Sequence, residues 1–123
     1  MIQASRTFPP HTRSPRAARA FVREVLEGRV APDTVEAAAL VTSELVTNAV
    51  VHAQTDARLD IRADGGTVTI RVEDAEVRPP VVRHPSPWDA SGRGLLIVEQ
   101  TARHWGVQPV SENGKSVWAA LGE

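Results

Sequence analysis

The chain contains no cysteine, which excludes disulfides, thiolate nucleophiles and cysteine-ligated metals. Aromatic residues make up only 4% of its 123 residues, so aliphatic side chains must form most of any core. Lys115 is the only lysine, and acidic and basic residues nearly cancel to a formal net charge of -1. This balance gives no electrostatic basis for binding nucleic acid or a membrane surface.

Long apolar runs are also missing from the sequence. No stretch reaches the roughly 18 apolar residues of a membrane span, and residues 1–20 lack the apolar core of a signal peptide. We therefore expect a cytoplasmic protein. With 41% hydrophobic and 24% charged residues, the chain suits one folded domain over residues 1–123.

The pattern of apolar residues predicts an α+β fold. Hydrophobic periodicity indicates, in order, a strand, two helices, two strands, a loop, a helix and two further strands. The clearest strands cover 57–63 and 67–74 and are joined by a tight turn at Asp64-Gly65-Gly66. Helices gathered on one face of a mostly antiparallel, mixed sheet would form a two-layer sandwich.

Prolines and small polar residues mark the starts of the first two helices. Ser14 is a good N-cap and Pro15 suits the first turn, and Pro32-Asp33 repeats this arrangement before a longer helix over about 33–53. The first helix is expected to bury one apolar stripe, made of Ala17, Ala20, Phe21, Val25 and Leu26.

The second helix carries polar residues where a buried face is expected. Glu44 and Asn48 lie four residues apart and thus roughly 40° apart around the helix, and His52 follows on the same side. An unpaired carboxylate on this face would cost several kcal/mol, so a cation, a ligand or a water must compensate it, unless Glu44 reaches the helix edge. His52 suits a capping role as well as a site role, and a zinc site would need more ligands. The flanking residues are apolar: Leu40, Val51, Val41 and Leu45.

A second carboxylate ends the predicted strand 67–74. Alternation carries the inward-facing positions of Ile70 and Val72 onto Asp74, and the proline-rich stretch 75–91 follows directly. Long loops in small domains are often functional, and pockets form beside them. Asp74 is therefore a candidate site residue, with turn capping as the alternative.

The remaining candidate residues are two glycines at the start of the third helix and a serine at the start of the last strand. Gly92 and Gly94 bracket the start of the third helix, where free N–H groups favour phosphate. The glycine patterns of P-loop and Rossmann sites are both missing from the sequence. Ser116 begins an apolar strand in which Trp118 is interpreted as a core or interface residue.

Together, four segments resemble the GHKL ATP-binding fold shared by gyrase B, histidine kinases and mismatch-repair ATPases. The nearest likeness is to its small branch of anti-sigma factor serine/threonine kinases. "SELVTNAVVHA" matches the N box of that branch, and "IRVEDAEV" matches its G1 box in position. "SGRGLLIVEQTARHWG" matches the G2 box and "GKSVWAAL" resembles the last strand, so the likeness spans about residues 14–121.

The resemblance implies a role for each matched residue. Asn48 would be the Mg²⁺ ligand that bridges to the nucleotide phosphates, and Glu44 would be the general base. Asp74 would accept a hydrogen bond from the adenine amino group, supported by Ser116. These side chains are expected to surround one cavity shaped for Mg-ATP. Residues 75–91 would form the ATP lid, and the phosphate end would be lined by Gly92, Arg93 and Gly94.

One segment departs from the family pattern. The G1 box of the family runs Asp-x-Gly-x-Gly, whereas this chain reads Asp74-Ala75-Glu76-Val77-Arg78. Without these glycines the backbone approaches adenine less closely, and Glu76 adds an acidic side chain nearby.

The resemblance implies an ATP- and Mg²⁺-dependent protein serine/threonine kinase that binds a sigma factor and phosphorylates a small antagonist protein. Members of this branch commonly form homodimers. A non-catalytic ATP-binding or partner-binding module is the alternative. The catalytic half of a two-component histidine kinase fits less well, because no room exists for a helix pair with a phosphoacceptor histidine. A further alternative is a plain α+β domain that binds no nucleotide, in which case Asn48→Ala is expected to change only stability.

Overall fold

The structure, a computed structural model, describes residues 1–75, 94–111 and 114–122. Its five strands form one sheet in the order β1-β2-β3-β5-β4, in which each neighbouring pair is antiparallel. The mixed sheet expected from the sequence is therefore antiparallel throughout its described strands. These strands are β1 (Ile2–Phe8), β2 (Ala57–Asp64), β3 (Thr67–Asp74), β4 (His104–Ser111) and β5 (Gly114–Gly122).

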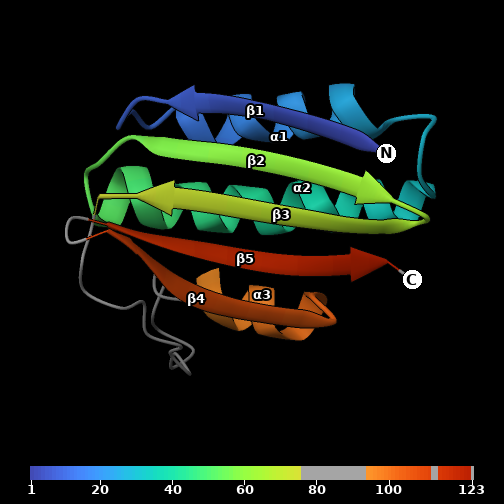
Figure 1. Cartoon of the computed structure of the whole chain (residues 1–123). Coiled ribbons are helices and arrows are strands. Elements are labelled where there is room, and N and C mark those ends of the chain that lie inside the picture. Colours follow the sequence, from blue (N-terminus) through green and yellow to red (C-terminus); the bar gives the residue numbers. More distant parts are fainter. Residues whose placement is uncertain (76–93, 112–113, 123) are drawn as a thin grey trace, which may run out of the picture.

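The described helices lie on one face of this sheet, as Figure 1 shows. We call the sheet face toward the helices the inner face and the opposite one the outer face. The predicted two-layer α+β sandwich is thereby confirmed. The helices are α1 (Ser14–Leu26), α2 (Pro32–Thr47) and α3 (Gly94–Thr101), and the short π-helical turn η1 (Asn48–His52) continues α2.

Alternating side chains place β2 and β3 at the centre of the core. The register pairs Ile61 with Ile70, and both are fully buried on the inner face. Gly65 and Gly66 have positive φ angles of 58° and 89°, which the two-residue turn between these strands requires and which glycine adopts at no steric cost. The predicted hairpin is therefore confirmed.

The last strand lies inside the sheet, between β3 and β4. Its pairing with β4 is the hairpin expected from the sequence. Its pairing with β3 sets Asp74 opposite Lys115, which is 41 residues away along the chain. Because β5 has a neighbour on each side, its backbone is paired twice, and most of its residues are buried.

The first helix begins and packs differently from the prediction. Ser14 is the first helical residue rather than the cap, and its Oγ donates a hydrogen bond to the carbonyl of Pro9 at 2.7 Å. Ala17 and Ala20 are exposed, because a small alanine side chain gives a helix little preference for which face it buries. The stripe that packs most deeply consists of Ala18, Val22 and Leu26.

α2 and η1 together form the core helix of the sandwich. They span Pro32–His52, which is long and apolar enough to cross a membrane by length and composition alone. However, 56% of its apolar window is buried inside the fold, where it contacts α1, α3 and the sheet. This apolar helix therefore packs as the centre of a protein core, and it carries Glu44 and Asn48 at its carboxyl end.

Candidate functional site

Glu44 lies at the border of the buried side of α2. It is half-buried, and Val41 and Leu45 beside it are buried. On its other side, however, Leu40 and Val51 are 42% and 41% exposed. The expectation that an apolar face embeds the Glu44–Asn48 pair is therefore wrong on this side of the helix.

The environment of Glu44 changes its affinity for a proton. Burial raises the pKa of the Glu44 carboxyl above its usual value, and the nearby charge of Arg19 acts against this by lowering it. Arg19 belongs to α1, and its guanidinium donates a hydrogen bond to Ser43 Oγ at 2.6 Å. A half-buried carboxyl with a raised pKa is suited to act as a proton acceptor.

Asn48 stands where the helix changes from α-helical to π-helical geometry. Its N–H donates to the carbonyls of both Glu44 and Leu45, and its own carbonyl accepts from the N–H of Ala53 at 2.9 Å. Single π-helical turns inside longer helices are frequent at functional sites. η1 also contacts β3, so Asn48 belongs to a turn that lies against the strand ending in Asp74.

Thr55 connects the end of η1 to the end of β3. Its N–H donates to the carbonyl of Ala49 at 3.0 Å, and its Oγ1 accepts from the N–H of Ala75 at 3.4 Å. These bonds join the segment after Asn48 to the residue after Asp74. The structure thus brings together the helix end and the strand end that the sequence assigns to one site. No sequence motif predicts this role of Thr55.

Asp74 closes the inner face of β3, as predicted, and is 8% exposed. Its Oδ1 accepts a hydrogen bond from Lys115 Nζ at 3.1 Å, and the two side chains are 4% and 9% exposed. Gly114 permits this approach of β5, because a Cβ at that position would overlap the carbonyl oxygen of Asp74. Sequence reasoning noted Lys115 as the only lysine but missed this pair, since no local pattern reports the register between β3 and β5.

Of the other predicted site residues, Ser116 lies away from Asp74. Ser116 is buried, but its Oγ accepts a hydrogen bond from the guanidinium of Arg71 at 3.0 Å on the outer face. It faces away from Asp74, because adjacent residues of a strand point to opposite faces. His52 is exposed, and Gly94 begins α3. Outside the described residues lie Gly92, Arg93 and, within the expected lid, residues 76–91.

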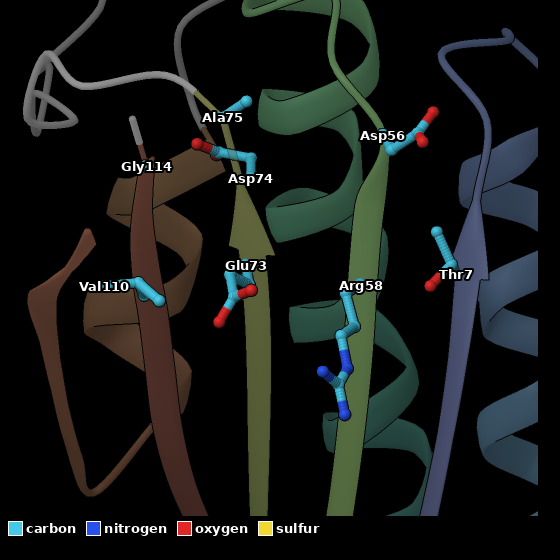
Figure 2. Close-up of a pocket in the computed structure, with 8 residues that line it drawn as sticks. All are labelled: Thr7, Asp56, Arg58, Glu73, Asp74, Ala75, Val110 and Gly114. Carbon is cyan, nitrogen blue, oxygen red and sulfur yellow. The ribbon is translucent and has the colours of Figure 1, made fainter. Parts of the chain in front are cut away.

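A hollow of about 350 Å³ opens on the outer face near the end of β3. Figure 2 shows Arg58 and Glu73 in front of the strands and the helices behind them. Asp74 contributes to this hollow, but Glu44 and Asn48 do not. It is therefore not the shared cavity that the sequence predicts.

The candidate side chains Glu44, Asn48 and Asp74 offer carboxylate and amide oxygen atoms. Carboxylate and amide oxygens suit Mg²⁺, which is usually held by one or two protein ligands together with water and substrate phosphates. Within residues 1–75, 94–111 and 114–122, no group of three or more His, Cys, Asp or Glu side chains could hold a metal. Carboxylate and amide oxygens are the donor types that Mg²⁺ uses when it is bound together with phosphates.

Known structures share the fold of this chain. It is similar to the structure of the RsbU and RsbW domains of Rv1364c from Mycobacterium tuberculosis, with a TM-score of 0.73 at 18% sequence identity. This likeness covers 99% of the present chain but 32% of that one, and it shows a shared fold. No curated protein matches the sequence significantly.

A family profile adds to this likeness. The histidine kinase-like ATPase domain matches residues 8–121, from the end of β1 to the last buried residue of β5. The match thus includes the helix with Glu44 and Asn48, the strand that ends in Asp74 and the strand that carries Lys115. The chain therefore belongs to the histidine kinase-like ATPase domain family.

Proposed function

We propose that the chain is an ATP- and Mg²⁺-binding anti-sigma regulatory protein that acts as a serine/threonine kinase on a small antagonist protein. The observation that carries this proposal is the junction of η1 with β3. Hydrogen bonds through Thr55 join the segment after Asn48 to the strand that ends in Asp74. Membership of the ATPase family supports nucleotide binding, and the motif likeness to the anti-sigma branch supports the regulatory role.

In this proposal, Asn48 holds Mg²⁺ and Asp74 accepts a hydrogen bond from the adenine amino group. When bound, Mg-ATP would supply the γ-phosphoryl group and leave as ADP, with the metal offsetting phosphate charge. Glu44 accepts the proton of the partner's serine hydroxyl, for which its raised pKa and partial exposure are suited. Gly94 begins α3, whose N-terminal N–H groups favour phosphate. By the family resemblance, Gly92 and Arg93 would line the phosphate end as well.

The proposed substrate is a protein, and the surface beside Glu44 supports this choice. Leu40 and Val51, on the same side of the helix as the proposed base, are 42% and 41% exposed, and we propose that the partner protein covers them. The proposed partners are a sigma factor and its antagonist, with a homodimer as the assembly and the cytoplasm as the location.

A non-catalytic module with a degenerate site is the second candidate, and one observation favours it. The residues after Asp74 lack the two glycines of the G1 box, so the backbone approaches adenine less closely there. Such a module would bind ATP or a protein partner without transferring phosphate.

Thermal unfolding with and without Mg-ATP tests the nucleotide site. A ligand at a hundredfold excess over its Kd raises the free energy of unfolding by about 2.7 kcal/mol. Asn48→Ala and Asp74→Asn should abolish this rise, whereas Glu24→Gln, an exposed position on α1, should keep it. Unchanged stabilisation in both site variants would remove the assignment.

Phosphate transfer distinguishes the two candidates. Incubation with labelled Mg-ATP and a cell lysate should label one small protein. Glu44→Ala should keep nucleotide binding and stop this labelling, whereas Glu36→Gln, an exposed carboxylate earlier on the same helix, should not. Tight ATP binding by the unaltered protein without any labelled partner would favour the non-catalytic module.

A further inference from the structure

Lys115 lies beside the carboxylate proposed to contact adenine, and this supports an inference that rests on the proposed nucleotide site. We propose that Lys115 is a positioning residue that orients the Asp74 carboxylate toward the purine base and makes the site select adenine. The inference goes beyond the family resemblance, which implies a role for Ser116 at this place and none for Lys115.

The Lys115–Asp74 pair is built into the sheet. The two residues are direct partners in the β3–β5 register, their Nζ and Oδ1 atoms lie 3.1 Å apart, and both side chains are less than 10% exposed. Lysine is almost never this buried without a partner. Gly114 has no Cβ, which would overlap the carbonyl oxygen of Asp74. The start of β5 can therefore lie close to the end of β3.

The choice of lysine at this position is informative. Arginine accounts for 13 of the 14 lysine and arginine residues in the chain, and Lys115 is the exception. A guanidinium matches a carboxylate with two parallel N–H···O bonds and engages both oxygens, whereas an ammonium is a compact point charge. Lysine therefore engages Asp74 through Oδ1 as a point charge, whereas arginine at this position would impose a two-bond geometry on the carboxylate.

The base chemistry follows from the donor and acceptor pattern. Adenine carries an amino group, a donor, where guanine carries a carbonyl oxygen, an acceptor. An ionised carboxylate is acceptor-only, so an Asp74 held in place by Lys115 accepts from the amino group and is mismatched with the carbonyl. Selectivity for ATP over GTP is the expected result.

Binding of Mg-ATP and Mg-GTP, measured by calorimetry, tests this role. Lys115→Arg keeps the charge and should stay folded, yet its affinity for ATP should fall by about tenfold or more, and its preference over GTP should largely disappear. Arg71→Lys is the matched control, because it changes a cation on the outer face of the same strand pair. It should leave both affinities unchanged.

Each outcome of this experiment decides something. If Lys115→Arg binds ATP with the unaltered affinity and the same preference over GTP, Lys115 is merely structural and the inference is overturned. If the unaltered protein binds ATP and GTP equally, the inference fails while the proposed nucleotide site stands. If the unaltered protein binds neither nucleotide, the proposed function fails as well.

Chemical labelling supplies a second measurement, made on Lys115 itself. Because Lys115 is the only lysine, reductive methylation of its amine can be followed by mass spectrometry of a single peptide. Arg62→Lys adds an exposed reference amine on the outer face of β2. Saturating Mg-ATP should slow methylation of Lys115 by about tenfold and leave the reference unchanged. Equal rates at Lys115 with and without bound nucleotide would contradict the inference.

Discussion

Two polar arrangements occupy the β3–β5 strand pair, and they face opposite sides of the sheet. On the inner face, Lys115 bonds to Asp74, and both side chains are almost fully buried. On the outer face, the guanidinium of Arg71 donates to Ser116 Oγ and to Gln108 Oε1, each at 3.0 Å. The inner arrangement pairs two full charges, whereas the outer one pairs a cation with neutral oxygens. The comparison teaches that strand alternation decides which of two adjacent residues, 115 or 116, reaches the candidate site.

Breaking the inner pair should have the largest effect on stability. Lys115→Met leaves the buried carboxylate of Asp74 without its cation and should lower the free energy of unfolding by about 3–5 kcal/mol. Arg71→Met removes only hydrogen bonds to neutral partners and should cost about 1 kcal/mol. Denaturant unfolding of both variants measures the difference, and equal losses would show that the two faces are energetically alike.

Substitution of the glycine beside the inner pair should also cost more stability than substitution of the glycine beside the outer arrangement. Gly114→Ala places a Cβ against the backbone carbonyl of Asp74, which cannot move without shifting β3, so a loss of about 3 kcal/mol is expected. Gly106→Ala places its Cβ 2.9 Å from the Trp118 indole. That half-buried side chain can shift, so a loss of about 1 kcal/mol is expected. Unfolding midpoints compare the two, and a larger loss at position 106 would reverse this expectation.

Ser116→Ala sharpens the comparison from the outer face. It removes one hydrogen-bond acceptor for Arg71 and should cost about 1 kcal/mol of stability. Since its hydroxyl faces away from Asp74, the rise in melting temperature with Mg-ATP should be unchanged. Loss of that rise would place Ser116 in the nucleotide site, as the family resemblance implies, and would overturn the division between the two faces.

The smallest expected effect is a change in pH dependence. Arg19→Met removes the positive charge that lowers the pKa of Glu44, so that pKa should rise further above its usual value. Because the deprotonated carboxylate acts as the proposed base, phosphate transfer should begin at a higher pH than in the unaltered protein. Arg23→Met, on the same helix but paired with Glu36, should leave the pH profile in place. A profile that Arg19→Met does not move would separate Glu44 from proton transfer.

Local pattern was sufficient for much of the fold. Period-two alternation predicted that Ile70, Val72 and Asp74 share the inner face, and all three are buried. It was less successful on α1, where several alanines made neighbouring faces look alike. Beside Glu44 it also failed, because the exposure of Leu40 depends on which elements pack against α2 and not on the residues of α2 alone.

Sequence alone determined the inward phase of the strands and the placement of Glu44 and Asn48 on one side of a helix. Both follow from the repeats of 2 and 3.6 residues that neighbouring positions must obey. Only the tertiary structure decided that Lys115, rather than Ser116, meets Asp74 and that Thr55 joins η1 to β3. The first contact depends on the register between β3 and β5, which sets Lys115 opposite a residue 41 positions away. The second joins a loop residue to a strand end 20 residues away, and no local repeat carries either piece of information.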